Sequence, residues 1–464
     1  MSILLPILVI LVVILIFNVI IFVHELGHFL AARWRGLEVE RFQIWFGKPI
    51  WKKTYNGVQY GLGWLPFGGF VALPQMAPME SIEGKNQNAE PLPPVKPIDK
   101  IIVAFAGPLF SFLLALLTAC LVYFVGKPDS RVNTTTIGYV VKDSPAMKGG
   151  LQIGDTITAV NSNPVDSFGG NMDTGVTENI ITSEGDTINF TVQRPGTPEP
   201  LVIKTGFDIP DTSWHQRKGL RKVGIGFQEA VIVGSIVPNG PGDKAGLKAD
   251  DVITHLNGTA ATSRDLLIDA AGTGKLQQLT VKRGEETLEL SITPLKPKGF
   301  DKTAFGIGFK FDESVLTETI LHPGPWSQIT ESANVMKRTI QLVSSSESSI
   351  GVDQLAGPIG IGKGYYEMLT SSANGWKLAL WFTVLFNINL AILNMMPFPV
   401  LDGGHIVLSF LEMISGRPIK ARVLEVIQTS FVLIIFGLFI YITSKDVGSL
   451  IPGKKQAPME FSAE

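Results

Sequence analysis

Four stretches of the chain are mainly apolar over about the length that crosses a lipid bilayer, roughly 20 residues. They cover residues 3–23, 101–125, 378–396 and 424–443. This pattern predicts four transmembrane helices. A signal peptide is the alternative for the first stretch, but no basic region precedes it and no small-residue cleavage site follows it.

The long segment between the second and third stretches, residues 127–375, contains an internal repeat. The sequence from Gly138 aligns without gaps with the sequence from Gly234, and each copy closes with a GIGF stretch. The matched pairs are Pro145 and Pro241, Gly150 and Gly246, Leu151 and Leu247, Asp155 and Asp251, and Asn161 and Asn257. Short runs of β-forming residues follow each copy, so the repeat predicts two β-rich modules of one fold.

Three shorter patterns lie around these segments. From Trp326 to Val343, apolar residues recur at three- and four-residue steps. This predicts an amphipathic helix that lies either on the membrane or against the second module. Residues 57–73 alternate in character and are rich in glycine, and the proline-rich polar residues 74–97 predict a loop.

Composition supports a membrane protein. Hydrophobic residues make up 45% and charged residues 17% of the 464 positions, and the mean hydropathy is +0.27. The net charge of −2 offers no basic face for nucleic acid. The single cysteine, Cys120, excludes an internal disulfide framework and lies in an apolar run, as a small core residue would.

Basic residues orient the predicted helices. They follow the first stretch and lie between the third and fourth, at Arg33, Arg35, Arg41, Lys48, Lys52, Lys53, Arg417, Lys420 and Arg422. By the positive-inside rule both connections face the cytoplasm. Both termini and residues 127–375 are then expected on the opposite side.

The end of the first stretch carries three ionisable residues, His24, Glu25 and His28, in the sequence HELGH. Such groups are costly at membrane depth and seldom lack a function there. Four-residue spacing puts both imidazoles on one helix face, where they can share a metal ion beside Glu25. HExxH is the zinc-protease signature, with the glutamate as general base. Chance is the alternative, and the cost of burial makes it the weaker one.

A catalytic zinc ion needs a third protein ligand. Glu38 and Glu40 are close in sequence but belong to a basic, solvated stretch. Asp402 lies in PFPVLDGG, where two prolines break the third helix and two glycines let the backbone approach closely. Irregular backbone at that depth is tolerated only around a cavity, so we favour Asp402.

HELGH in the first span, AGPLF in the second and NMMPFPVLDGG in the third together resemble the site-2 protease family of intramembrane zinc metalloproteases. The repeat resembles PDZ domains of the circularly permuted bacterial type, and its place between spans two and three resembles the RseP subgroup of Gram-negative bacteria. The resemblance covers nearly the whole chain. Residues 57–73 look like the family's membrane-associated β-hairpin, and a plain cytoplasmic hairpin is the alternative. It implies one Zn²⁺ held by His24, His28 and Asp402, Glu25 as catalytic base, and substrate binding by Asn394 and the hairpin residues Gly68, Gly69 and Phe70.

The resemblance also implies a substrate class. Its members would be single-pass membrane proteins already trimmed on the periplasmic side, such as anti-sigma factors, and remnant signal peptides, cleaved in the regulated intramembrane proteolysis of a stress response. The unwound substrate would join the hairpin edge as a strand. The partners would be these substrates and the lipid bilayer, without nucleic acid. The chain would be a multi-pass inner-membrane protein with its termini and PDZ domains periplasmic and its active site towards the cytoplasm.

Two other function classes stay open from the residues alone: a soluble-type HExxH peptidase tethered by its first helix, and a non-enzymatic PDZ scaffold. The first repeat copy has NSNPV and Lys148-Gly149 where a PDZ domain of this type has an Asn-Gly turn and small residues. We therefore expect the modules to screen substrates by size rather than capture peptides tightly.

The expected fold is a polytopic α-helical membrane protein with four transmembrane helices, a membrane-associated β-hairpin and two tandem PDZ domains. The expected segments are the first transmembrane helix with HExxH (1–36), the hairpin and cytoplasmic loop (37–99), the second helix (100–126), PDZ domain 1 (127–229), PDZ domain 2 (230–315), an amphipathic helix and membrane-proximal segment (316–375), the third helix (376–402), a cytoplasmic connection with the fourth helix (403–444), and a tail (445–464).

Overall fold

The computed structural model of the protein describes residues 4–76, 93–417, 421–450 and 459–461. The chain divides into two units. The membrane unit comprises Met1–Pro128, Ile320–Gln341 and Leu355–Val447, and the β-rich unit comprises Asp129–Thr319, Leu342–Gln354 and Gly448–Glu464. Lys420, the side chain of Arg422 and most of the expected 74–97 loop lie outside the described residues.

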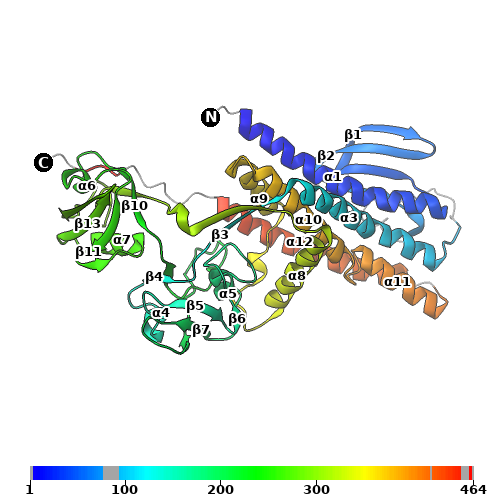
Figure 1. The fold of residues 1–464 in the computed structure, drawn as a ribbon. Coiled ribbons are helices and arrows are strands. Elements are labelled where there is room, and N and C mark those ends of the chain that lie inside the picture. The colour runs from blue at the N-terminus through cyan, green and yellow to red at the C-terminus, as the bar shows by residue number, and fades with distance from the viewer. Residues whose placement is uncertain (1–3, 77–92, 418–420, 451–458, 462–464) are drawn as a thin grey trace. The chain divides into compact units, whose positions relative to one another are not determined.

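Four helices are long and apolar enough to cross a membrane, and they confirm the four predicted stretches (Figure 1). They are α1 (Leu4–Arg35), α3 (Pro97–Val125), α10 (Gly375–Asn394) and α12 (Ala421–Leu450). α3 packs against α1, α10 and the shorter helix α11 (Asp402–Ser415). Only 6% of the apolar window of α12 is buried, as expected of a helix that faces lipid.

Helix α11 occupies part of the segment that was expected to be a plain connection. α10 ends at Asn394, the sequence with two prolines follows, and Asp402 opens α11. A Cβ on Gly403 would lie 2.3 Å from the Met395 carbonyl oxygen, and one on Gly404 would lie 2.0 Å from that of Phe398. Only glycine therefore lets α11 begin directly against the loop that precedes it.

The expected β-hairpin is larger than residues 57–73. These residues form one strand, β2 (Val58–Ala72), and its partner β1 (Arg41–Tyr55) lies before them. Asn56 and Gly57, with φ of 48° and 81°, form the tight turn that joins the strands. The register also shifts, so that the segment 41–44 pairs with both 59–62 and 69–72. The 3₁₀ turn η1 (Pro74–Met76) follows.

The amphipathic helix predicted at 326–343 is present as α8 (Pro325–Ser344), and its residues up to Gln341 belong to the membrane unit rather than to the second module. Its Ile329 joins a buried cluster with Ala115 and Ala119 of α3 and Val384 of α10. The apolar stripe of α8 therefore covers two membrane helices. A further helix, α9 (Pro358–Ser371), packs against α1 and α10, and its Gly360 N–H donates a hydrogen bond of 2.8 Å to Asp446 Oδ2 of α12.

The β-rich unit contains two modules with separate apolar cores, as the repeat predicts. Module 1 has two sheets, β4–β9 and β6–β5–β7–β8, and module 2 has one, in the order β14–β13–β11–β10–β15 with β12 beside β11. The elements of module 1 are β4 (Ile137–Val140), α4 (Pro145–Gly149), β5 (Thr156–Val160), β6 (Asn163–Pro164), α5 (Val176–Ile181), β7 (Ile188–Gln193), β8 (Leu201–Thr205) and β9 (Ile225–Phe227).

The elements of module 2 are β10 (Val231–Ile236), α6 (Pro241–Lys244), β11 (Val252–Leu256), β12 (Thr259–Ala260), α7 (Arg264–Gly272), β13 (Gln277–Arg283), β14 (Glu286–Ile292) and β15 (Ile307–Lys310). Outside the modules, β3 (Lys127–Val132) pairs with β16 (Leu316–Leu321), and η2 (Glu313–Val315) and η3 (Val352–Gln354) are single turns. In each module the strand of the GIGF stretch, β9 or β15, pairs with the first strand, β4 or β10.

One buried ion pair recurs in both modules. Arg194 Nε donates to Asp155 and Arg283 Nε donates to Asp251, each at 2.7 Å. Both aspartates are almost fully buried, and each arginine also bonds the carbonyl of the repeat glycine, Gly150 or Gly246. Burial raises the pKa of Asp251, but the Arg283 guanidinium and the Lys248 amide outweigh it and hold that pKa below its usual value.

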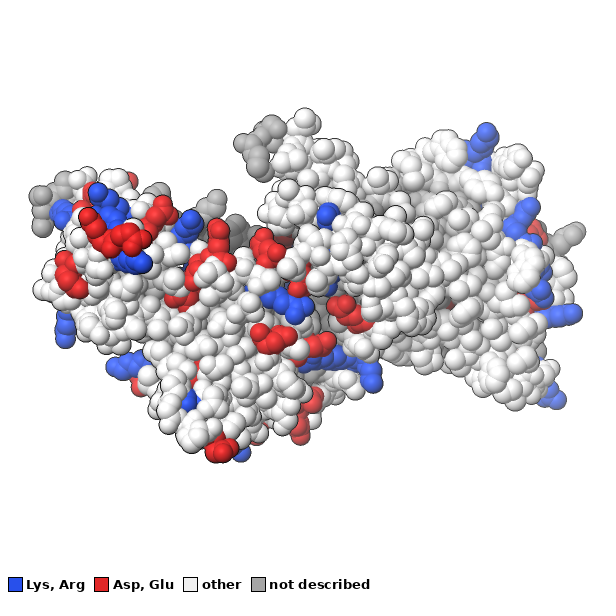
Figure 2. Space-filling model, viewed as in Figure 1, with Lys and Arg blue, Asp and Glu red and all other residues white. Residues whose placement is uncertain are grey.

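A group of exposed basic side chains lies at one end of the membrane unit. Figure 2 shows a broad uncharged surface beside Lys and Arg side chains at the right of the view, where α1 and α11 end in Figure 1. The exposed basic residues of these connections are Arg33, Arg35, Lys48, Lys52, Lys53 and Arg417. An uncharged band with cations at its edge is the surface expected of a bilayer-spanning bundle.

Candidate metal centre

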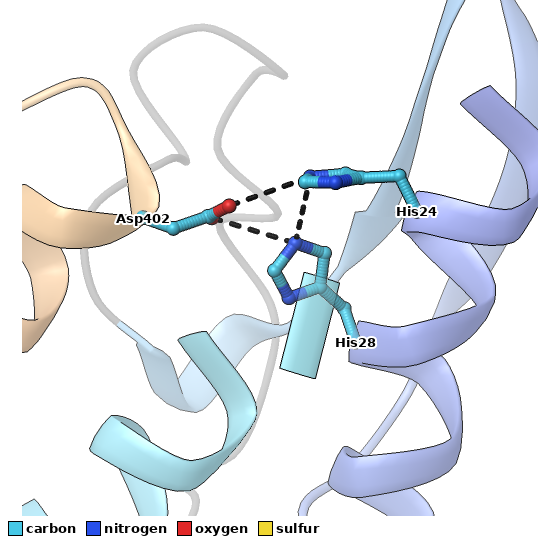
Figure 3. Close-up of side chains that lie close together, drawn as sticks. All are labelled: His24, His28 and Asp402. Carbon is cyan, nitrogen blue, oxygen red and sulfur yellow. Dashed lines mark hydrogen bonds and ion pairs between the residues drawn. The ribbon is translucent and has the colours of Figure 1, made fainter. Parts of the chain in front are cut away.

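Three side chains from two helices converge on one point. His24 and His28 come from α1 and Asp402 comes from the first turn of α11 (Figure 3). The two Nε2 atoms lie 3.3 Å apart, and Asp402 oxygens lie 3.3 Å from His24 Nε2 and 3.4 Å from His28 Nε2. Among the described residues, this is the His, Cys, Asp and Glu cluster close enough to hold a metal ion.

Helix α3 fixes the orientation of both imidazoles. Ser111 Oγ lies 3.0 Å from His24 Nδ1, and the Val103 carbonyl oxygen lies 2.8 Å from His28 Nδ1. Val103, Gly107 and Ser111 are spaced by four residues, so they lie on one face of α3 opposite the two histidines. Partners of this kind hold a metal-binding imidazole with its other nitrogen facing the ion.

The inward-facing atoms are electron-pair donors. A carbonyl only accepts hydrogen bonds, so a neutral His28 carries its proton on Nδ1 and turns the Nε2 lone pair inward. Asp402 Oδ2 is buried and has no hydrogen-bond partner among the described residues. Lone pairs and a carboxylate held this close repel one another unless a cation lies among them. The donor set therefore fits a metal ion.

The spacing of these atoms fits zinc in particular. Ligand atoms at tetrahedral corners, about 2.0–2.1 Å from zinc, lie about 3.3–3.4 Å from one another. The three observed separations are 3.3, 3.3 and 3.4 Å. Two imidazoles and one carboxylate leave a fourth corner open, as catalytic zinc sites do.

Glycine on α3 keeps this space free. A Cβ on Gly107 would lie 2.2 Å from His28 Nε2 and 2.9 Å from His24 Nε2. On α1, a Cβ on Gly27 would lie 2.4 Å from the Ala106 carbonyl oxygen, so the two helices approach closely at the site. The sequence alone assigns no role to the AGPLF motif, and in the structure its glycine leaves room beside the histidines.

Glu25 lies beside the hairpin. The backbone of Val71 in β2 forms a hydrogen bond with its carboxylate. A Cβ on Gly69 would lie 3.0 Å from Ile21 Cγ2 and 3.3 Å from Glu25 Cγ, so this glycine lets the strand lie against α1. The edge segment 69–72 pairs with 41–44, and no other strand among the described residues pairs with it.

The other residues that the sequence suggested as metal ligands or substrate-binding residues lie outside the metal-holding cluster. Glu38 is exposed and Glu40 half-buried in the link before β1, and neither belongs to the metal-holding cluster. Gly68 and Phe70 lie in β2, where Phe70 stacks on Phe46. Asn394 is the half-buried last residue of α10. Sequence reasoning missed Ser111 and Val103; the one signal for Ser111 was a hydroxyl four residues after Gly107 in an apolar helix.

Comparison with known proteins supplies the family. The family model described as peptidase family M50 matches residues 12–438. The chain belongs to peptidase family M50. It is 28% identical over 432 residues to the regulator of sigma-E protease RseP of Escherichia coli K12, covering 88% of this chain and 91% of that protein. A candidate zinc metalloprotease of Vibrio cholerae is 27% identical over 449 residues, with coverages of 88% and 91%.

Among solved structures, the PDZ domain of an SdrC-like protein from Listeria monocytogenes is 23% identical, and its match covers 19% of this chain and 93% of that domain at a TM-score of 0.17.

The family assignment decides the enzyme class. The chain is a zinc metalloprotease of the site-2 type and a multi-pass membrane protein. A non-enzymatic scaffold and a soluble-type tethered peptidase are both wrong as alternatives.

We expect Asp402→Ala to lower the zinc content of the purified protein well below that of the parent, because one of three donors is lost. Glu38→Ala and Glu40→Ala are the matched controls and should leave the zinc content unchanged, since neither side chain is in the cluster. Mass-spectrometric metal analysis measures all three. Loss of zinc in either glutamate variant, with zinc retained in Asp402→Ala, would show that the third ligand is misassigned.

Proposed function

We propose that His24, His28 and Asp402 hold the zinc ion of this peptidase and that Glu25 is its general base. The observation that carries the proposal is the triangle of Nε2, Nε2 and carboxylate atoms at 3.3–3.4 Å. The outward hydrogen bonds of both imidazoles support it, because they keep Nε2 free for an ion. Glu25 follows His24 directly in α1, and its carboxylate lies close enough to His24, His28 and Asp402 to interact with their charges.

In the proposed mechanism, a bound zinc ion supplies Lewis-acid polarisation of the scissile carbonyl and of the attacking water. Glu25 accepts the proton of that water and returns it to the leaving amine, a contribution of about 10²–10⁴-fold in rate. Ser111 and the Val103 carbonyl hold the imidazole rings in place during the reaction. Gly107 keeps the face of α3 clear for the reacting groups.

The hairpin is the proposed substrate platform. A transmembrane helix hides its amides in internal hydrogen bonds, so the scissile bond must be presented in an extended conformation. The segment 69–72 has an unpaired edge and touches Glu25 through Val71, so a strand added there would run past the general base. Gly68, Gly69 and Phe70 would contact this strand, and Asn394 would hold it beside Asp402.

The proposed substrates are transmembrane segments of single-pass membrane proteins that have lost their periplasmic domains, with anti-sigma factors as one class and remnant signal peptides as another. The Escherichia coli relative supports the first class, because its name is regulator of sigma-E protease RseP. The proposed location is the inner membrane, with the termini and both circularly permuted PDZ-like modules in the periplasm. The basic residues after α1 support an active site near the cytoplasmic face.

Glu25→Gln should abolish cleavage of a model transmembrane substrate while zinc stays bound. The change removes the proton acceptor and leaves all three donors, so the rate should fall by roughly 10²–10⁴-fold. Cleavage in detergent and zinc content are measured on the same preparation. Glu38→Gln, which removes an exposed carboxylate outside the cluster, is the control and should cleave at the parental rate. Full activity in Glu25→Gln would contradict the proposed base.

The PDZ-like modules are proposed to screen substrates by size. Their residues lie in the β-rich unit and supply none of the metal-holding cluster, so we assign them a role in substrate selection rather than in bond breaking. In this proposal the two modules exclude a substrate that carries a large folded periplasmic domain. A trimmed substrate would pass them.

Deletion of residues 137–313 tests this screening role. Asn133 N–H donates to the Val315 carbonyl at 2.7 Å, so the two ends lie close together and a short flexible linker can join them. We expect the deleted chain to cleave both trimmed and untrimmed substrates, whereas the parent cleaves only the trimmed one. If the zinc-loaded deletion variant fails to cleave the trimmed substrate, the modules capture substrate instead.

A further inference from the structure

The C-terminal tail of the chain carries one buried aromatic side chain. Within the described segment Met459–Phe461, Met459 and Glu460 are exposed, but Phe461 is only 9% exposed. The Glu460 carbonyl oxygen accepts a hydrogen bond of 2.8 Å from the Lys298 N–H of module 2. The tail is thus held by one backbone bond and one buried ring.

The ring occupies a gap left by two glycines of module 2. A Cβ on Gly306 would lie 2.8 Å from Phe461 Cε2, and a Cβ on Gly240 would lie 3.2 Å from Cδ2 and Cε2. Gly306 opens the GIGF stretch and has a φ of +69°, and its carbonyl accepts the Val237 N–H at 2.8 Å. We call this gap, bounded by Gly240, Pro241 and Gly306, the aromatic socket.

Module 1 fills the same place with its own side chain. Ser144 matches Gly240 in the repeat, and Gly224 matches Gly306 as the first glycine of GIGF. A Cβ on Gly224 would lie 2.5 Å from Ser144 Cβ, so no socket is left there. At this matched position module 1 has a side chain and module 2 has none, and module 2 receives the ring of Phe461.

We propose that module 2 is a binding site for an aromatic residue near a chain terminus, and that the occupant of its socket is the C-terminal tail of the same chain. The inference is independent of the proposed catalytic residues. One buried ring and one backbone bond give weak affinity by themselves. The tail is tethered through residues 451–458, however, and a short tether gives an effective concentration in the millimolar range.

A consequence follows for other ligands of module 2. PDZ domains bind peptide termini beside the loop that opens the GIGF-type strand, and the socket borders that loop at Gly306. A peptide that needs the socket must displace Phe461 first. The tail therefore acts as a competitor in cis, and the apparent affinity of module 2 for aromatic termini depends on whether the tail is seated.

The test uses full-length chains and a fluorescent peptide with the sequence of residues 457–464, APMEFSAE. Phe461→Ala empties the socket, and Met459→Ala, which changes an exposed side chain, is the matched control. Fluorescence anisotropy should show at least tenfold tighter peptide binding to Phe461→Ala than to the parent or to Met459→Ala. A peptide with alanine in place of its phenylalanine should not bind.

A second variant closes the socket without unfolding the module. Gly240 has φ −77° and ψ 171°, which any residue adopts, and in module 1 the matching Ser144 accepts the Met147 N–H and caps α4. Gly240→Ser combined with Phe461→Ala should therefore fold and lose peptide binding. Hydrogen exchange of the Lys298 amide gives a peptide-free readout and should be faster in Phe461→Ala than in the parent.

Two results would overturn the proposal. One is equal peptide binding to the parent, to Phe461→Ala and to the double variant, which places the peptide elsewhere. The other is unchanged exchange at Lys298 in Phe461→Ala together with no peptide binding, which means that the ring does not hold the tail.

Discussion

The structure is organised around three electron-pair donors that face one another within a membrane bundle. His24, His28 and Asp402 stand 3.3–3.4 Å apart, and such a cluster is stable only when positive charge lies among its members. Helix packing serves this constraint. Gly27 lets α1 meet α3, Gly107 leaves the face of α3 open, and the glycines after Asp402 let α11 start against its own loop.

A second constraint acts on the irregular backbone near the site: polar backbone groups in a bilayer need hydrogen-bond partners within the protein. In the hairpin, the Gln43 side-chain amide donates to the carbonyls of Trp45 and Gly47 at 3.0 and 2.9 Å, where the register shifts. Gln43 is 1% exposed. The carbonyl groups of Trp45 and Gly47 at the bend of β1 therefore have a hydrogen-bond partner within the hairpin. The edge segment 69–72, in contrast, keeps backbone groups beside Glu25 that no other described strand pairs. An edge left open at this place suits an added strand and would otherwise be a cost.

Much of this arrangement can be predicted from the sequence, because several residues have few possible roles in their sequence context. HELGH at the end of an apolar helix and an aspartate between helix-breaking residues together predict a metal site. Matched repeat positions such as Asp155 and Asp251 predict two modules of one fold. What could not be predicted depends on pairing between distant segments. The strand β1, the docking of α8 on α3 and α10, and the partners of His24 and His28 on α3 each need a neighbour that no local pattern names. Phe461 is the clearest case, since a lone aromatic in a polar tail gives no sign of its socket.

X-ray absorption at the zinc edge of the purified, zinc-loaded parent protein tests the central claim most directly. The account predicts a first shell of nitrogen and oxygen at about 2.0–2.1 Å, with the outer-shell scattering of two imidazoles and no sulfur. A shell with a single imidazole, or one made of six oxygens, would mean that His24, His28 and Asp402 do not form the zinc site.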